Sequence, residues 1–89
     1  MGKPALASDV YALGCVIYEM AVGSAPFIGS VAELAIAHIE REPPHLADRA
    51  PEMAALDPIV ARTLAKNPAA RPTMAELARE LEALRAGAD

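Results

Sequence analysis

The side chains able to do nucleophilic, acid–base or metal chemistry are few in this sequence and stand far apart. Cys15 is the single cysteine and lies inside an apolar segment, and the two histidines, His38 and His45, have no companions at metal-ligand spacing. A lone cysteine among apolar residues is usually a packed thiol, so we expect Cys15 to be inert. The sequence therefore predicts no catalytic, cofactor-binding or metal-binding residue.

Three charged residues stand in apolar or proline-rich surroundings and are better candidates for a specific role. Asp9 precedes a long apolar run, Glu19 is the only charge between residues 10 and 22, and Arg71 is followed by a proline. From the residues alone, we expect Asp9 to cap a helix by accepting backbone N–H groups. We expect the Glu19 carboxylate to reach solvent at the end of that helix.

The segment 9–22 must position Asp9 and Glu19. Its apolar residues follow helical spacing and its opposite face is hardly more polar, which predicts a central helix buried on all sides. We expect Ser8 or Asp9 as the N-cap and Gly23 in the left-handed conformation just past the end. The segment is too short to span a bilayer, which takes about 20 apolar residues.

Three more helices are predicted, and no segment alternates with the period of a strand, so we expect an all-α fold. Two of them begin with capping boxes, Ser30 with Glu33 and Thr73 with Glu76. Residues 43–53 hold three prolines and are predicted to be an irregular connection. The expected helices are 31–41, from 54 or from Asp57-Pro58 to 65, and 74–86.

The size and composition of the chain limit what can cover the central helix. The 89 residues predict one small domain, in which burial is incomplete. Although 54% of the residues are hydrophobic, alanine contributes most to that share and has little area to bury. We therefore expect the central helix to lack enough packing partners within this chain.

The charge pattern excludes several classes of partner. The net charge is −4 with both signs interspersed, and there is no basic run, so we expect neither nucleic acid nor an anionic membrane surface as partner. The first residues lead into no apolar stretch of a signal peptide. A cytoplasmic location is the expectation.

Three motifs, in order, resemble the second half of the C-terminal lobe of eukaryotic-type protein kinases. They are Asp9 followed by Gly14 after four residues, the pair Pro26-Phe27, and the segment 66–72 that contains Arg71-Pro72. Residues 9–20 resemble the F helix of that family, and the later helices would be G, H and I. The alanine-rich composition is similar to that of bacterial serine/threonine kinases.

The resemblance implies structural roles for three residues and a contact for a fourth. Asp9 and Gly14 would belong to the F helix, where the aspartate also holds the backbone of the catalytic loop. Arg71 would be the arginine of a buried pair with a glutamate that precedes the F helix. This glutamate is absent here, so we expect Arg71 to turn to solvent or to meet a partner chain. Glu19 could contact a basic peptide substrate.

The same resemblance implies that the chain is catalytically incomplete. Phosphoryl transfer requires a glycine-rich loop, a strand lysine, a catalytic aspartate with its asparagine, and a magnesium-binding aspartate. None of these motifs occurs in the sequence, and ATP and Mg²⁺ are cofactors of the parent family that this chain is not expected to bind. We expect residues 1–89 to be a partial kinase domain without the N-lobe, catalytic loop and activation segment.

Two classes of function remain open. In the first, the chain is a truncated serine/threonine kinase domain whose role is to support the catalytic loop and the peptide-docking surface. In the second, it is a non-enzymatic helical interaction module that covers its apolar faces by self-association or by binding a kinase lobe. A complementing half of a split kinase is a third possibility. All of them make another protein, or a second copy, the expected partner.

Overall fold

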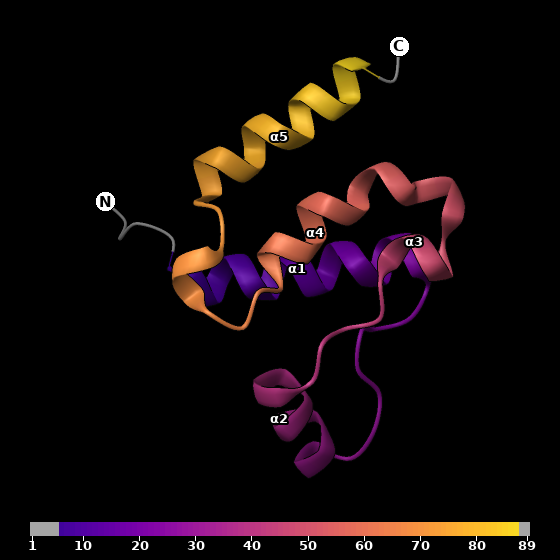
Figure 1. Cartoon of the computed structure of the whole chain (residues 1–89), viewed down its shortest axis with the longest axis vertical. Helices are drawn as coiled ribbons and strands as arrows, with labels where there is room; N and C mark the ends of the chain where they lie inside the picture. Colours follow the sequence, from indigo (N-terminus) through magenta and orange to yellow (C-terminus); the bar gives the residue numbers. More distant parts are fainter. Residues whose placement is uncertain (1–5, 88–89) are drawn as a thin grey trace.

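The computed structural model describes residues 6–87, which form helices joined by short loops, with no strand among them (Figure 1). The all-α fold expected from the sequence is confirmed. The elements are α1 (Ala7–Val22), α2 (Val31–Glu40), α3 (Leu46–Arg49), the 3-10 helix η1 (Pro51–Leu56), α4 (Asp57–Thr63), the 3-10 helix η2 (Pro68–Ala70) and α5 (Met74–Gly87).

Helix α1 begins earlier than the sequence predicts. Leu6 is the N-cap residue, and its carbonyl accepts the backbone N–H groups of Asp9 and Val10 at 2.9 and 3.2 Å. Asp9 is therefore the third helical residue, and the expectation that it or Ser8 is the N-cap is wrong. The prediction for the other end is confirmed, since Gly23 has φ 90° and donates its N–H to the Glu19 carbonyl at 2.7 Å.

One face of α1 carries the core of the protein. Its buried residues are Val10, Gly14 and Tyr18. Val10 packs with Ile59 of α4 and Leu77 of α5, and Tyr18 lies in a second cluster with Leu46, Ala50, Val60 and Leu64. In Figure 1, α4 lies between α1 and α5, and the first of these clusters contains residues of all three helices.

The opposite face of α1 is open, so the described residues do not bury this helix on all sides as predicted. Val16 is 52% exposed and Met20 is 80% exposed, four residues apart on the same side of the helix. The shortage of packing partners expected from the chain length is visible here.

The connection between α2 and α4 is more regular than predicted. Residues 46–56 form α3 and η1, whereas the sequence analysis expected an irregular segment at 43–53. Leu46 and Ala50, which are four residues apart, are both buried against Tyr18. Because residues at this spacing lie on one side of a helix, their burial supports a helical turn despite the prolines around it. Helix α4 begins at Asp57 with Pro58 second, as one of the two predicted starts had it.

Both predicted capping boxes are present. Ser30 and Glu33 exchange backbone and side-chain hydrogen bonds at 2.9 and 3.2 Å, and Thr73 and Glu76 do so at 2.7 and 3.1 Å. An ion pair between Arg62 and Glu80 joins α4 to α5.

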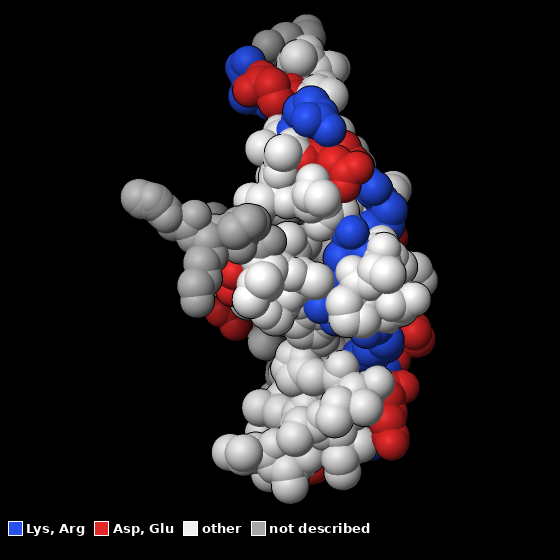
Figure 2. Space-filling view, turned by 90° about the vertical axis from the view of Figure 1, so that its left-hand side faces the viewer, with Lys and Arg blue, Asp and Glu red and all other residues white. Residues whose placement is uncertain are grey.

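Helix α2 lies apart from the other helices, at the lower end of the molecule in Figure 1. Large apolar side chains of α2 and the loop before it are exposed, and the lower part of the face seen in Figure 2 is largely free of charged residues. These side chains are Ile28, Val31, Ile36 and Ile39. Between residues 6 and 87, no helix has the length and apolar character needed to cross a bilayer.

Candidate functional site

Arg71 joins the N-terminal end of α1 to the end of α4. Its Nε donates to the Ala65 carbonyl at 2.8 Å, Nη1 to the Ala7 carbonyl at 3.1 Å and Nη2 to the Lys66 carbonyl at 3.4 Å. The guanidinium also lies over the ring of Tyr11, 4.7 Å from its centroid. The expectation that Arg71 turns to solvent is therefore wrong, because backbone carbonyls and an aromatic ring satisfy the cation instead.

Next to Arg71, a second cation binds α2. Lys66 Nζ donates to the carbonyls of Ala37 and His38 at 2.8 and 3.1 Å, and it lies 4.8 Å from the centroid of the Phe27 ring. These carbonyls belong to the last turn of α2, where the negative end of the helix dipole favours a cation, and the Ala37 carbonyl also accepts the backbone N–H of Arg41 at 3.0 Å. Pro26, next to Phe27, is buried, so this part of the loop before α2 packs onto the body of the protein.

Tyr11 connects the two cations. Its hydroxyl is hydrogen-bonded to His38 Nδ1 at 2.7 Å, and the ring of His38 stands edge-on to those of Tyr11 and Phe27. Burial raises the pKa of the Tyr11 hydroxyl and lowers the pKa of Lys66. We call Tyr11, Phe27, His38, Lys66 and Arg71 the aromatic–cation junction.

The sequence analysis missed this junction as a unit. Tyr11 and His38 are 27 residues apart, and Lys66 contacts backbone atoms, which leave no trace in a sequence pattern. The useful signal was compositional: three of the few aromatic or imidazole rings and two cations flank the predicted helix ends.

Asp9 and Gly14 take structural positions on α1. The Asp9 carboxylate accepts the N–H of Leu6 at 3.1 Å, at the positive end of the helix, so Asp9 is the N3 partner of the N-cap residue and not the N-cap itself. Gly14 is buried where α1 crosses α4, and a Cβ built on it would lie 2.1 Å from Thr63 Oγ1. Glycine is therefore needed at this position for close packing.

Glu19 stands at the other end of α1 from Asp9 and Arg71. It is exposed beside Met20, on the open side of the helix. This agrees with a carboxylate that reaches solvent, and its contact with a peptide stays a prediction. The structure thus brings Asp9 and Arg71 to one end of α1 and leaves Glu19 at the other.

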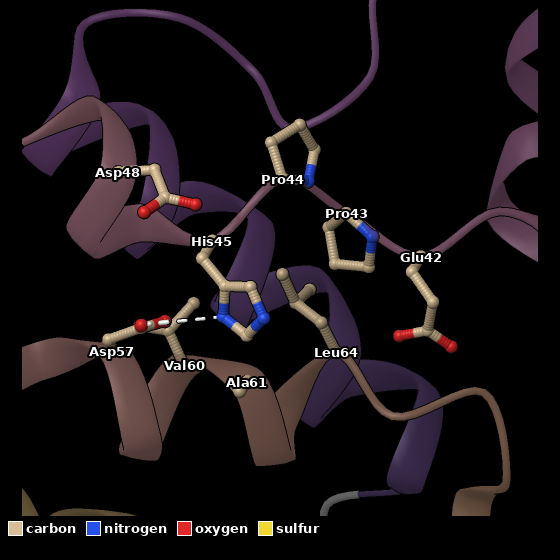
Figure 3. A pocket seen from close by; sticks show the side chains of 9 residues that line it. All are labelled: Glu42, Pro43, Pro44, His45, Asp48, Asp57, Val60, Ala61 and Leu64. Carbon is tan, nitrogen blue, oxygen red and sulfur yellow. Dashed lines mark ion pairs between the residues drawn. The ribbon is translucent and has the colours of Figure 1, made fainter.

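A cavity lies elsewhere, between the loop after α2 and α4 (Figure 3). It has a volume of about 280 Å³, and His45 points across it toward Asp57, with Nδ1 and Oδ2 3.4 Å apart. Asp48 and Glu42 lie on opposite sides of His45 in this view. The part of the chain between residues 6 and 87 contains no group of three or more possible ligands that could hold a metal ion.

Burial governs the thiol as well. Cys15 is half-buried on α1, and burial raises its pKa, which keeps the thiol protonated and agrees with the expectation of an inert side chain. The described residues therefore show a set of interlocking structural contacts, with cations that bind helix-end carbonyls and no arrangement of a nucleophile with a base.

Comparison with known proteins places this helical assembly in a family. The family model described as protein tyrosine and serine/threonine kinase matches residues 2–81. A protein of Corynebacterium efficiens described as a probable serine/threonine-protein kinase is 45% identical over 93% of the chain, and serine/threonine-protein kinase PknB of Mycolicibacterium smegmatis is 45% identical over 83%. Serine/threonine-protein kinase PknJ of Mycobacterium tuberculosis is 36% identical over 76%.

The fold and the junction define a class of protein: an all-α unit in which side-chain contacts join the ends of the helices. The chain belongs to the protein kinase family, as the match over residues 2–81 shows. It spans only 12 to 14% of the length of these relatives. The predicted resemblance to a kinase, and to bacterial serine/threonine kinases in particular, is confirmed.

Proposed function

We propose that these residues form the helical second half of the large lobe of a serine/threonine kinase and act there as structural support. The observation that carries the proposal is the open side of α1, where Val16 and Met20 are exposed near Glu19. In a kinase domain, this side would support the catalytic loop and the peptide-docking surface. Covering two large apolar side chains is worth about 1.5–3 kcal/mol each.

The proposed role leaves the phosphoryl-transfer chemistry to other parts of a kinase. The 89 residues contain none of the glycine-rich, lysine, aspartate and asparagine motifs that position ATP and Mg²⁺. We propose that this chain alone binds neither cofactor and transfers no phosphate. A cytoplasmic place in a signalling kinase goes with this proposal.

A chimeric kinase tests the supporting role. The segment of PknB from Mycolicibacterium smegmatis that aligns with this chain is replaced by the residues of this chain, and phosphorylation of a protein substrate is measured. We expect the chimera to keep activity, because the two proteins are 45% identical over the exchanged segment. A chimera that folds, as judged by its thermal unfolding, but is inactive would contradict the proposal.

The matched variants of the chimera separate support from mere folding. Arg71→Met removes the contacts with Ala7, Ala65 and Tyr11, and we expect it to lower activity. Arg79→Met changes an exposed arginine of α5 and is expected to leave activity unchanged. The isolated chain, incubated with ATP and Mg²⁺, should phosphorylate nothing.

A non-enzymatic interaction module is the second candidate function. It is favoured by the exposed apolar side chains on α2 and the loop before it, which are separate from the open side of α1. A module of this kind would bind a second copy or a kinase lobe. A defined dimer in solution, with no gain of activity in the chimera, would favour this function.

A further inference from the structure

Helix α2 is attached to the body of the protein at few points. Of its residues only Ala37 is buried, while Val31 and Ile39 are 87% and 72% exposed. None of the other helices packs along it, and it stands apart in Figure 1. Helices that bury little apolar surface are the parts of a protein that open at low free energy.

The loops on both sides of α2 can serve as hinges. Gly23 and Gly29 have positive φ values of 90° and 153°, and they bound the loop between α1 and α2. On the other side, Arg41 leaves the helix with extended backbone, and Pro43-Pro44 follow. Neither loop is helical, so no continuous run of helical backbone hydrogen bonds connects α2 to α1 or to α3.

The contacts that hold α2 in place converge on Lys66 and His38. Lys66 Nζ binds the Ala37 and His38 carbonyls at 2.8 and 3.1 Å, and Tyr11 binds the His38 ring at 2.7 Å. Two carbonyls in the last turn of α2 thus accept hydrogen bonds from one side chain of another part of the chain, and the Ala37 carbonyl accepts the Arg41 N–H in addition. A charged donor to such carbonyls forms the stronger class of hydrogen bond.

We propose that α2 and its flanking loops form a unit that opens separately from α1, α4 and α5, with Lys66 as the latch that keeps it closed. The ammonium group donates to two carbonyls in the last turn of α2 and lies over the Phe27 ring. When this contact breaks, α2 loses its main polar attachment to the rest of the protein, while the Arg41 N–H still closes the end of the helix. The core clusters around Val10 and Tyr18 contain no residue of α2 and stay packed. This inference goes beyond the proposed function and does not depend on it.

Amide hydrogen exchange followed by mass spectrometry tests the latch. In the unmodified chain, we expect residues 31–40 to exchange faster than the core turns of α1. Lys66→Met keeps an apolar stem but removes the charge and the donors, and Tyr11→Phe removes the bond to His38 while keeping the ring. We expect each variant to speed exchange in α2, about tenfold for Lys66→Met, with little change in α1 and α4.

Arg62→Met is the matched control. It also removes a cation, but one that pairs with Glu80 of α5, so exchange should rise in α5 and stay unchanged in α2. Three results would contradict the latch. The first is exchange in α2 as slow as in the core of α1, and the second is an equal rise of exchange in all helices with Lys66→Met. The third is an effect of Arg62→Met on α2 that equals that of Lys66→Met. The measurement is repeated in the chimeric kinase, where the remaining lobe holds α1, and the same three results count against it there.

Discussion

Gly14 lies at the crossing of α1 and α4, where a side chain has no room. A methyl group there would lie 2.1 Å from Thr63 Oγ1 and 2.8 Å from Thr63 Cβ, so the helices would have to separate. We expect Gly14→Ala to destabilise the fold by about 1–3 kcal/mol, as overpacked core sites do. A lower thermal unfolding midpoint of the chimeric kinase is the measurement.

Gly87 supplies the control for this substitution. It is also helical, at the end of α5, and a Cβ built on it meets nothing within 4 Å. Because alanine favours helix over glycine, Gly87→Ala should leave the midpoint unchanged or raise it. A midpoint that Gly14→Ala leaves as high as Gly87→Ala does would show that the crossing of α1 and α4 tolerates a methyl group, contrary to the geometry.

Arg71 is the residue whose partners decide how far it can be changed. A lysine has one compact ammonium group and no planar face, so it cannot bind carbonyls of two separate segments while lying over the Tyr11 ring. We expect Arg71→Lys to cost about 1–3 kcal/mol. Thermal unfolding of the chimera measures this, with Arg79→Lys on exposed α5 as the neutral counterpart. Identical midpoints for the two variants would mean that the charge alone matters.

Part of the site could be foreseen from single residues. The spacing of Asp9 and Gly14, and Arg71 before Pro72, pointed to structural roles, and the structure gives Gly14 and Arg71 tight environments. The partners of Arg71 could not be foreseen because they are backbone carbonyls, which every residue offers. Asp9 was expected as the N-cap, but the helix begins earlier, at Ala7. Leu6 adopts the extended backbone of an N-cap residue, although its side chain cannot cap the helix.

At the scale of elements, α2 and α5 each begin with a capping box that contains a glutamate. A hydrogen bond from the Ser30 backbone N–H is the main cause that lowers the pKa of Glu33, and one from Thr73 does the same for Glu76. A carboxyl whose pKa is lower in the folded protein stabilises the fold above its unfolded pKa. This stability is lost as the pH falls through the lowered value.

Acid should therefore weaken both helix starts. We expect the helical signal of the chain to fall as the pH drops below about 4.5, the ordinary pKa of a glutamate, because the protonated side chains accept weaker hydrogen bonds. The pH dependence of circular dichroism measures the loss. Glu33→Gln with Glu76→Gln keeps the acceptor without the charge and should flatten the curve in this range. An unchanged curve would assign the acid sensitivity to other carboxylates.

Elements with a local signal were predictable, whereas those that depend on distant packing were not. Ser30, Glu33, Thr73 and Glu76 lie within one turn of each other in pairs, so the sequence placed the starts of α2 and α5 correctly. The prolines at 43, 44 and 51 suggested an irregular segment, yet α3 and η1 form there because Leu46 and Ala50 pack on Tyr18, about 30 residues earlier.

At the scale of the whole molecule, residues 6–87 expose large apolar side chains on two surfaces. One is the side of α1 with Val16 and Met20, and the other belongs to α2 and the loop before it, with Ile28, Val31, Ile36 and Ile39. The helical core between them is confined to two small clusters. A unit of this kind gains stability from whatever covers its open faces, and so its unfolding reports whether that cover is supplied by the chain itself.

Thermal unfolding of the 89-residue chain, followed by far-ultraviolet circular dichroism at two concentrations, tests whether the chain covers its own apolar surfaces. We expect a broad transition together with binding of a dye for apolar surface, because the open side of α1 needs a further part of a kinase lobe. A cooperative transition whose midpoint rises with concentration would show that copies of the chain cover one another, which favours the interaction module. A cooperative transition independent of concentration would mean that the two core clusters suffice, and that Val16 and Met20 are tolerated in water. The double substitution Val16→Ser with Met20→Ser separates these three cases. It should reduce dye binding if the transition is broad, and lower the midpoint if the midpoint depends on concentration. It should change neither dye binding nor the midpoint if the transition is cooperative and independent of concentration.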